Sequence, residues 1–274
     1  MRRVIDRMGW LWVGAALLFP AAAGRCAEVV RIGIGGEPGL YSVEQWKADW
    51  PGCGWQDGVR EGNVSVVRLP GAGEALGLRV NYRVGEIGPE RGGCGWRYPI
   101  GRREAAELRY WVRFSRDFDW VKGGKLPGLS GGPENVSGGR PADGKNGFSA
   151  RLMWRADGRG EAYVYHTRQP DRYGDRMGFP EDFRFPVDVP VRVRLRVEMN
   201  DPGKNNGKVQ VWIGSEQGGE LVEREVLHRT DLVWRSVGDF GVDSLYFETF
   251  HGGSDRSWAP TRPCWADFWD LSLR

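Results

Sequence analysis

Three segments of the sequence carry side chains that bind anions and transfer protons. These side chains are Lys125, Ser149, Arg151, Tyr163 and Tyr165. The glycines of residues 123–128 allow a tight turn and a close approach to a ligand, so the lysine among them is held more firmly than an ordinary surface lysine. An ammonium group, a guanidinium group and phenols suit an acidic substrate. The alternative is a solvated loop lysine beside two unrelated, half-exposed strand faces.

Whether the arginine and the tyrosines meet depends on the turn between their strands. The sequences around Arg151 and Tyr165 alternate as strands do, and Asp157-Gly158 between them is typical of a hairpin turn. A plain two-residue loop would place Arg151 and Tyr165 on opposite faces of the sheet. An odd-length loop or a bulge would place them on one face, for example with Arg151 opposite Tyr165. We expect the odd or bulged form, because it brings the serine, the arginine and both tyrosines into one patch.

The elements that must position these groups are short strands. Alternation of apolar and polar residues recurs in residues 76–82, 108–114, 191–198, 209–213 and 269–273. In the last of these, Trp269, Leu271 and Leu273 are expected to share one face. The only helix expected is a short one near Val43 to Trp50. This pattern predicts an all-β fold, a β-jelly roll or concanavalin-like β-sandwich of two antiparallel sheets.

The N-terminus has the pattern of a secretory signal. Basic residues (Arg2, Arg3 and Arg7) precede an apolar stretch from about Met8 to Ala23 that ends in small residues. A transmembrane anchor is the alternative, but the stretch is short for a span. We expect cleavage after Ala23, with Ala27 as a second possibility, and a secreted or periplasmic protein.

The remaining chain is expected to be one domain. We divide it into a signal peptide at 1–23, an N-terminal extension at 24–59 packed on the domain edge, and a jelly-roll domain at 60–274. Residues 130–147 are rich in Gly, Pro, Asn and Ser and predict a long loop, which in a compact domain is often functional.

The net charge and the number of potential metal ligands restrict the molecules that this protein can bind. The formal charge is +3, and removal of three Arg and one Asp with residues 1–23 leaves about +1. A near-neutral domain argues against nucleic-acid binding but permits a local basic site for an acidic polymer. With 3 His and no Cys-x-x-Cys, we expect no metal and no cofactor. We further expect no membrane contact after signal cleavage, and a monomer.

Cysteines are the candidates for a covalent crosslink. Cys53 and Cys94 lie in two near-identical Gly-Cys-Gly-Trp tetrads. An exported protein can retain disulfides, although sequence does not determine their connectivity. We expect these two residues to pair.

The motifs together resemble polysaccharide lyase family 14. The resemblance rests on Gly123-Gly124-Lys125-Leu126-Pro127-Gly128, on Ser149-x-Arg151, on Tyr163-x-Tyr165 and on the tail at residues 250–260. The glycine-lysine stretch is also similar to that of glucuronan lyases. The similarity covers about residues 60–274. It implies a jelly roll with a cleft across a concave sheet, which depolymerises alginate or related glucuronate-containing polymers without hydrolysis.

The resemblance implies that these five residues form the site, and the chemistry of the reaction suggests a role for each. β-Elimination removes the proton at C5 of a uronate and expels the oxygen at C4. In the preferred scheme Lys125 is the base, Tyr165 donates the proton, Arg151 and Ser149 hold the carboxylate, and Tyr163 orients the sugar. Exchange of the Lys125 and Tyr165 roles is the alternative. No His lies between Lys125 and Ser149, where some family members have one, which leaves the group that neutralises the carboxylate open.

Other classes of protein have weaker support. A non-catalytic carbohydrate-binding β-sandwich would need aromatic residues but no lysine and tyrosine at one point. A glycoside hydrolase would need two carboxylates about 5–9.5 Å apart, for which Glu161 and Glu248 are weak candidates. A structural or adhesion module is not favoured by these motifs.

Overall fold

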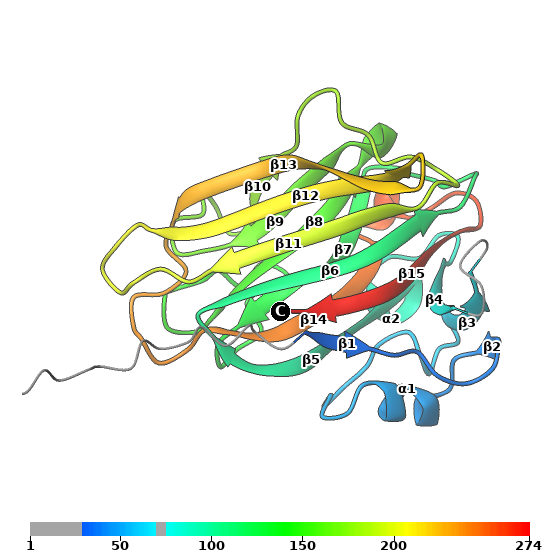
Figure 1. The fold of residues 1–274 in the computed structure, drawn as a ribbon, viewed down its shortest axis with the longest axis horizontal. Coiled ribbons are helices and arrows are strands. Elements are labelled where there is room, and N and C mark those ends of the chain that lie inside the picture. Colours follow the sequence, from blue (N-terminus) through cyan, green and yellow to red (C-terminus); the bar gives the residue numbers. More distant parts are fainter. Residues whose placement is uncertain (1–28, 70–74) are drawn as a thin grey trace, which may run out of the picture.

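The computed structural model describes residues 29–69 and 75–274, which form fifteen strands and two short α-helices (Figure 1). The first sheet contains β1 (Val30–Ile32), β2 (Gly39–Leu40), β3 (Val64–Arg68), β4 (Leu76–Tyr82), β6 (Ala105–Phe114), β11 (Val191–Glu198), β12 (Gly207–Gln217), β13 (Glu220–Leu232) and β15 (Cys264–Leu273). The second contains β5 (Gly93–Arg103), β7 (Gly123–Gly131), β8 (Phe148–Arg155), β9 (Gly160–Tyr165), β10 (Asp175–Gly178) and β14 (Val242–His251). The helices are α1 (Val43–Asp49) and α2 (Pro89–Gly92).

The two sheets form the expected β-sandwich of jelly-roll type. The nine-stranded sheet has the order β13-β12-β11-β6-β15-β4-β3-β2, with β1 paired to β15. The six-stranded sheet has the order β10-β9-β8-β7-β14-β5. Every pair of strands within these sheets is antiparallel. The expected fold class is therefore confirmed.

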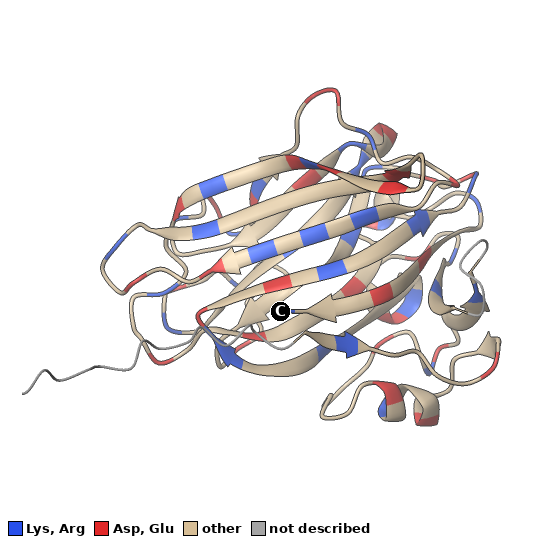
Figure 2. Ribbon diagram, in the orientation of Figure 1, with Lys and Arg blue, Asp and Glu red and all other residues tan. Residues whose placement is uncertain are grey.

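Alternation decides which side chains enter the core. In β11, Val193 and Leu195 are fully buried, whereas Arg192, Arg194 and Arg196 point away from the core. Figure 2 shows basic residues repeated along β11, and the alternating burial of this strand turns their side chains to the outer face of the nine-stranded sheet. The apolar side chains of the two sheets meet between them and form the core.

A bulge changes the face of the last strand. Phe268, Leu271 and Leu273 are buried, but Trp269 pairs with Trp111 on the outer face. The ladder shifts register between Trp269 and Ser272 because Asp270 adopts a φ of 48°. The expectation that Trp269 shares a face with Leu271 and Leu273 is therefore wrong.

The residues before β3 pack on the sandwich. The short helix expected near Val43 to Trp50 is confirmed as α1, and the Oγ of Ser42 caps it by accepting a hydrogen bond from the Gln45 N–H at 3.1 Å. Trp46 and Trp50 lie edge-on to Trp96 of β5, with ring centroids 6.2 and 5.1 Å apart. Aromatic contacts thus join the N-terminal segment to the six-stranded sheet.

The expected disulfide is wrong, because Cys53 and Cys94 are both free thiols. Cys94 is fully buried in β5 on the core side, next to Thr249 of β14. Cys53 follows α1, and its thiol donates instead to the carbonyl oxygen of Arg97 at 3.2 Å. The two similar tetrads thus lie in different surroundings, one thiol in the core and the other bonded to a backbone carbonyl.

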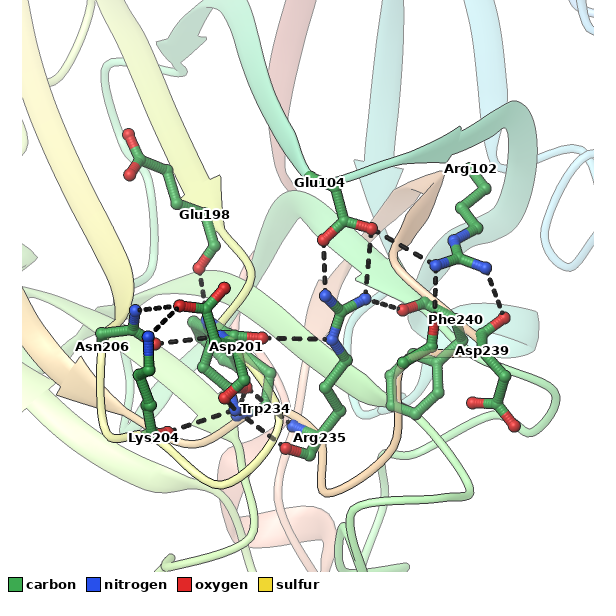
Figure 3. Close-up of polar contacts among 12 residues, drawn as sticks. Arg102, Glu104, Glu198, Asp201, Lys204, Asn206, Trp234, Arg235, Asp239 and Phe240 are labelled. Carbon is green, nitrogen blue, oxygen red and sulfur yellow. Dashed lines mark hydrogen bonds and ion pairs between the residues drawn. The ribbon is translucent and has the colours of Figure 1, made fainter.

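A polar cluster fixes the segment between β13 and β14. The buried Arg235 guanidinium contacts the Glu104 carboxylate and the carbonyl oxygen of Phe240 (Figure 3). The N–H of the next residue, Ser236, donates to the carbonyl oxygen of Gly144 at 2.9 Å. This links the cluster to residues 132–147, the long loop between β7 and β8, which was expected at 130–147.

The expected signal peptide, residues 1–23, lies outside the described residues. Within residues 29–69 and 75–274, no helix has the length and apolar character needed to cross a membrane.

Candidate active site

The β8–β9 hairpin places the predicted residues on one face of the six-stranded sheet. Ser149 pairs with Tyr165, and Arg151 pairs with Tyr163. The Arg155 N–H donates to the carbonyl oxygen of Arg159, and this last pair of the hairpin encloses the three-residue turn Ala156–Gly158, whose central residue has a left-handed φ of 60°. The expected odd-length loop is confirmed, although the direct partner of Arg151 is Tyr163 rather than Tyr165. We call this face, which is turned away from the core, the site face.

Strand β7 brings the lysine onto the same face. Lys125 pairs with Met153 of β8 and Phe250 of β14, so it belongs to a strand rather than to a solvated loop. Gly124 beside it runs close to Trp154: a Cβ at Gly124 would lie 2.1 Å from the indole ring. Only glycine permits this approach, which explains the glycine before the lysine.

The ammonium group of Lys125 is held in a partly enclosed position. Its Nζ lies 2.9 Å from the sulfur of Met153 and 3.6 Å from the centroid of the Tyr163 ring. Desolvation lowers the pKa of Lys125 well below its usual value, and the positive charges of Arg151 and Arg155 lower it further. A lysine in these surroundings can lose its proton and serve as a base.

The two tyrosines differ in access. Tyr165 is fully buried, and its hydroxyl oxygen accepts a hydrogen bond from the Gly139 N–H at 3.0 Å. Tyr163 is half-buried, and the two rings meet edge to face with centroids 5.7 Å apart. Burial raises the pKa of Tyr163, and interaction with Tyr165 raises it further, so its phenol keeps its proton. Tyr163 therefore lies between Lys125 and the enclosed Tyr165.

Ser149 lies beneath the long loop. Its hydroxyl donates to the carbonyl oxygen of Val136 at 2.7 Å, and only 1% of the residue is exposed. Val136 and Ala142 also pack against Tyr165. Residues 132–147 thus cover Ser149 and Tyr165, and the serine hydroxyl is already engaged by the backbone.

Arg151 has an acidic partner that the sequence analysis did not assign to it. Its guanidinium forms an ion pair with Glu248 of β14, and only 2% of Arg151 is exposed. Burial alone lowers the pKa of Arg151, but Glu248 and the nearby phenols outweigh it and raise the pKa. The Tyr246 hydroxyl lies 3.4 Å from Glu248, and its ring centroid lies 4.7 Å from the Arg151 Cζ. Alternation in β14 places Tyr246 and Glu248 on one face, but the pairing of β14 beside β7 could not be read from the sequence.

The two glutamates considered for hydrolysis are both engaged by arginines. Glu248 pairs with Arg151, and Glu161 pairs with Arg155 at 2.9 Å and Arg176 at 3.2 Å. Among the described residues, no three His, Cys, Asp or Glu side chains gather where they could hold a metal ion.

Comparison with known structures finds similarity to alginate lyases and to a glucuronan lyase. The marine PL-14 alginate lyase from Aplysia kurodai is 26% identical, with a TM-score of 0.76 over 90% of this chain and 98% of that chain. The alginate lyase Aly36B is 25% identical, with a TM-score of 0.74 over 90% of this chain and 96% of its own. A mutant of that enzyme has been solved in complex with alginate tetrasaccharide. The endo-β-1,4-glucuronan lyase from the fungus Trichoderma reesei, at 14% identity and a TM-score of 0.53 over 81% of this chain and 91% of its own, shares the fold.

No curated protein sequence matches the chain significantly. Residues 72–271, most of the chain, match the family model described as polysaccharide lyase 14. The chain therefore belongs to polysaccharide lyase family 14 and is a polysaccharide lyase.

Proposed function

We propose that this enzyme cleaves a uronic-acid-containing polysaccharide of the alginate or glucuronan type by β-elimination and leaves an unsaturated uronate. The observation that carries the proposal is the contact between Lys125 and Tyr163 on the site face, where a base and a phenol lie side by side. Similarity to alginate lyases, one of them solved with an alginate oligosaccharide, supports an acidic sugar polymer as the substrate.

The proposed reaction removes one proton from C5 of the uronate and adds one proton to the oxygen that leaves C4. Lys125 Nζ takes the C5 proton, and the electrons of the C5–H bond form the C4–C5 double bond. The C4–O bond breaks, and a phenol gives its proton to the departing oxygen. Arg151, whose positive charge acts on Lys125, also stabilises the negative charge that develops at the uronate.

We assign the proton transfer to Tyr163, which exchanges the two tyrosine roles expected from the sequence. Tyr163 is half-buried and lies against Lys125, whereas Tyr165 is enclosed by the long loop and bonded to Gly139. Tyr165 then acts behind Tyr163, through the interaction that raises the pKa of the Tyr163 phenol.

Arg151 and Ser149, which were expected to hold the substrate carboxylate, already have partners within the protein. Arg151 is paired with Glu248, and the Ser149 hydroxyl is bonded to Val136. We propose that these two residues hold the site in place and do not bind the substrate carboxylate directly. Their charge and hydrogen bonds hold the strands and the loop that surround Lys125, rather than forming a free anion clamp.

We also propose that the enzyme is exported and that residues 24–59 form an extension on the edge of its lyase domain. The basic and apolar N-terminal sequence supports export, and a polymeric substrate would be met outside the cell. Mass spectrometry of the secreted protein would locate the new N-terminus, for which we expect residue 24 or 28. Retention of the intact N-terminus would contradict export by cleavage.

The function is tested with purified protein and four polymers: polymannuronate, polyguluronate, glucuronan and hyaluronan. A lyase produces the ultraviolet absorbance of a conjugated, unsaturated uronate from at least one of them. New reducing ends without that absorbance would indicate hydrolysis, and binding without cleavage would indicate a carbohydrate-binding module. Either result would overturn the proposal.

A further inference from the structure

A second pair of basic residues on the site face is arranged around one acid. Glu161 of β9 is 4% exposed and contacts the Nε of Arg155 at 2.9 Å and the Nε of Arg176 at 3.2 Å. The two arginines come from β8 and β10, on either side of β9. One buried carboxylate therefore orients two guanidinium groups.

The contacts leave the outer part of both guanidinium groups available. Within the described chain, no terminal nitrogen of Arg155 or Arg176 donates a hydrogen bond to the protein, and the shortest contact of each guanidinium with Glu161 is through Nε. The side chain of Arg176 is 63% exposed, and that of Arg155 is 13% exposed. A guanidinium held through Nε presents its two terminal N–H groups as a fork, which matches the two oxygens of a carboxylate.

The charge balance distinguishes this pair from the other arginines of the site face. Arg151 is paired with Glu248, and Arg97 of β5 is paired with Asp243 at 3.4 Å, so each has its own counter-charge. Arg155 and Arg176 share Glu161, which leaves one positive charge uncompensated. Any acidic group of a ligand is attracted to this part of the face more than to the β5 side.

The position of the pair relates it to the proposed chemistry. Arg155 is close enough to Lys125 to lower its pKa, and Arg176 pairs directly with Tyr163 across β9 and β10. The Cζ of Arg155 lies 5.6 Å from the centroid of the half-buried Trp258 ring, which adds an apolar surface beside the charge. A charged fork next to an aromatic ring suits an acidic sugar.

We propose that Arg155 and Arg176, oriented by Glu161, form a carboxylate-binding subsite for the uronate next to the one attacked by Lys125. This rests on the proposed function and deepens it: the enzyme requires a run of at least two acidic sugars, one at Lys125 and one over β8–β10. Arg155 and Arg176 contact the substrate, and Glu161 is a positioning residue.

The first test compares Arg155→Gln and Arg176→Gln with a matched control, Arg196→Gln. Arg196 lies on β11 in the other sheet, is 40% exposed and is likewise paired with a glutamate. We expect each site variant to raise the KM for the cleaved polymer about tenfold or more, on the usual strength of charge-assisted pairs. We expect a smaller change in kcat and a weaker dependence of KM on salt. The control keeps wild-type values.

The second test measures binding without turnover. In a Lys125→Ala background, calorimetry compares a uronate oligosaccharide with the same oligosaccharide after reduction of its carboxyl groups. The parent is expected to prefer the acidic form, and adding Arg176→Gln is expected to remove most of that preference. Because Arg176 is largely exposed, this variant should fold even if Arg155→Gln does not.

The outcomes separate the two proposals. If the wild type yields no unsaturated product from any polymer, the lyase proposal fails, but calorimetry still tests the subsite. If the wild type is active while the site variants keep KM and the preference for the acidic oligosaccharide within twofold of their parents, the subsite is overturned.

Discussion

The Nζ of Lys125 lies 3.6 Å from the centroid of the Tyr163 ring, on the site face, where Arg151 is also buried. The lysine is thereby placed against a phenol and near fixed positive charges. Burial favours an uncharged amine that can accept a proton, by desolvation, and the arginines favour it by repulsion.

Replacement of Lys125 by Arg should abolish turnover without unfolding the protein. A guanidinium keeps its proton and cannot act as a base, so we expect kcat to fall by about 10²–10⁴-fold. The absorbance of the unsaturated product measures this loss. Lys122→Arg is the matched control, because Lys122 is exposed and its amine contacts Ser257 at 2.6 Å. Near-normal activity of Lys125→Arg would exclude the lysine as the base.

Substitution of Tyr163 should mainly lower activity, whereas substitution of Tyr165 should mainly lower stability. Tyr163→Phe removes the proposed proton donor and should lower kcat by about 10²-fold or more. Tyr165→Phe leaves the Gly139 N–H without its partner, so it should lower the free energy of unfolding by about 1–3 kcal/mol with a smaller loss of kcat. Urea unfolding and initial rates measure the two effects. The reverse order of activity losses would return the donor role to Tyr165.

The pH dependence of kcat should change when the positive charge of Arg155 is removed. Only the uncharged form of Lys125 accepts a proton, so activity rises with pH through the lysine pKa. Arg155 lowers that pKa, and Arg155→Gln removes the repulsion and raises it. We expect the rising limb of the kcat profile to move to higher pH, measured with saturating polymer. Arg176→Gln should leave the limb in place, and an equal shift in both variants would contradict this explanation.

Glu248→Gln should destabilise the fold more than the loss of a surface carboxylate. The substitution leaves the buried Arg151 charge without its counter-charge, which typically costs about 3–5 kcal/mol. The midpoint of urea unfolding measures this change at constant slope. Glu225→Gln provides the comparison, since Glu225 is 39% exposed and pairs with His228. Equal midpoints for the two variants would mean that the buried pair contributes little to stability.

Local patterns in the sequence determined the strands and their faces. Alternation in β6, β8, β9 and β11 follows from the two-residue period of an extended chain, which each segment expresses by itself. The shared face of Arg151 and Tyr163 was also predictable, because it depends only on loop parity within one hairpin. The bulge at Asp270 lay beyond such reasoning, since its left-handed residue is not a glycine.

Only the tertiary structure decided which of these faces meet. Glu248 reaches Arg151 because β14 lies beside β7, although the two residues are 97 positions apart. The loop at residues 132–147 encloses Ser149 and Tyr165. Packing likewise buries the Cys94 thiol in the core, whereas the Cys53 thiol donates to the Arg97 carbonyl oxygen. Alternation along a strand is set by its own backbone, whereas strand order and loop path are set by the burial of surfaces from the whole chain. The residue types thus indicated a β-sandwich with acid–base chemistry. Tertiary packing determines which of these side chains remain accessible to a substrate.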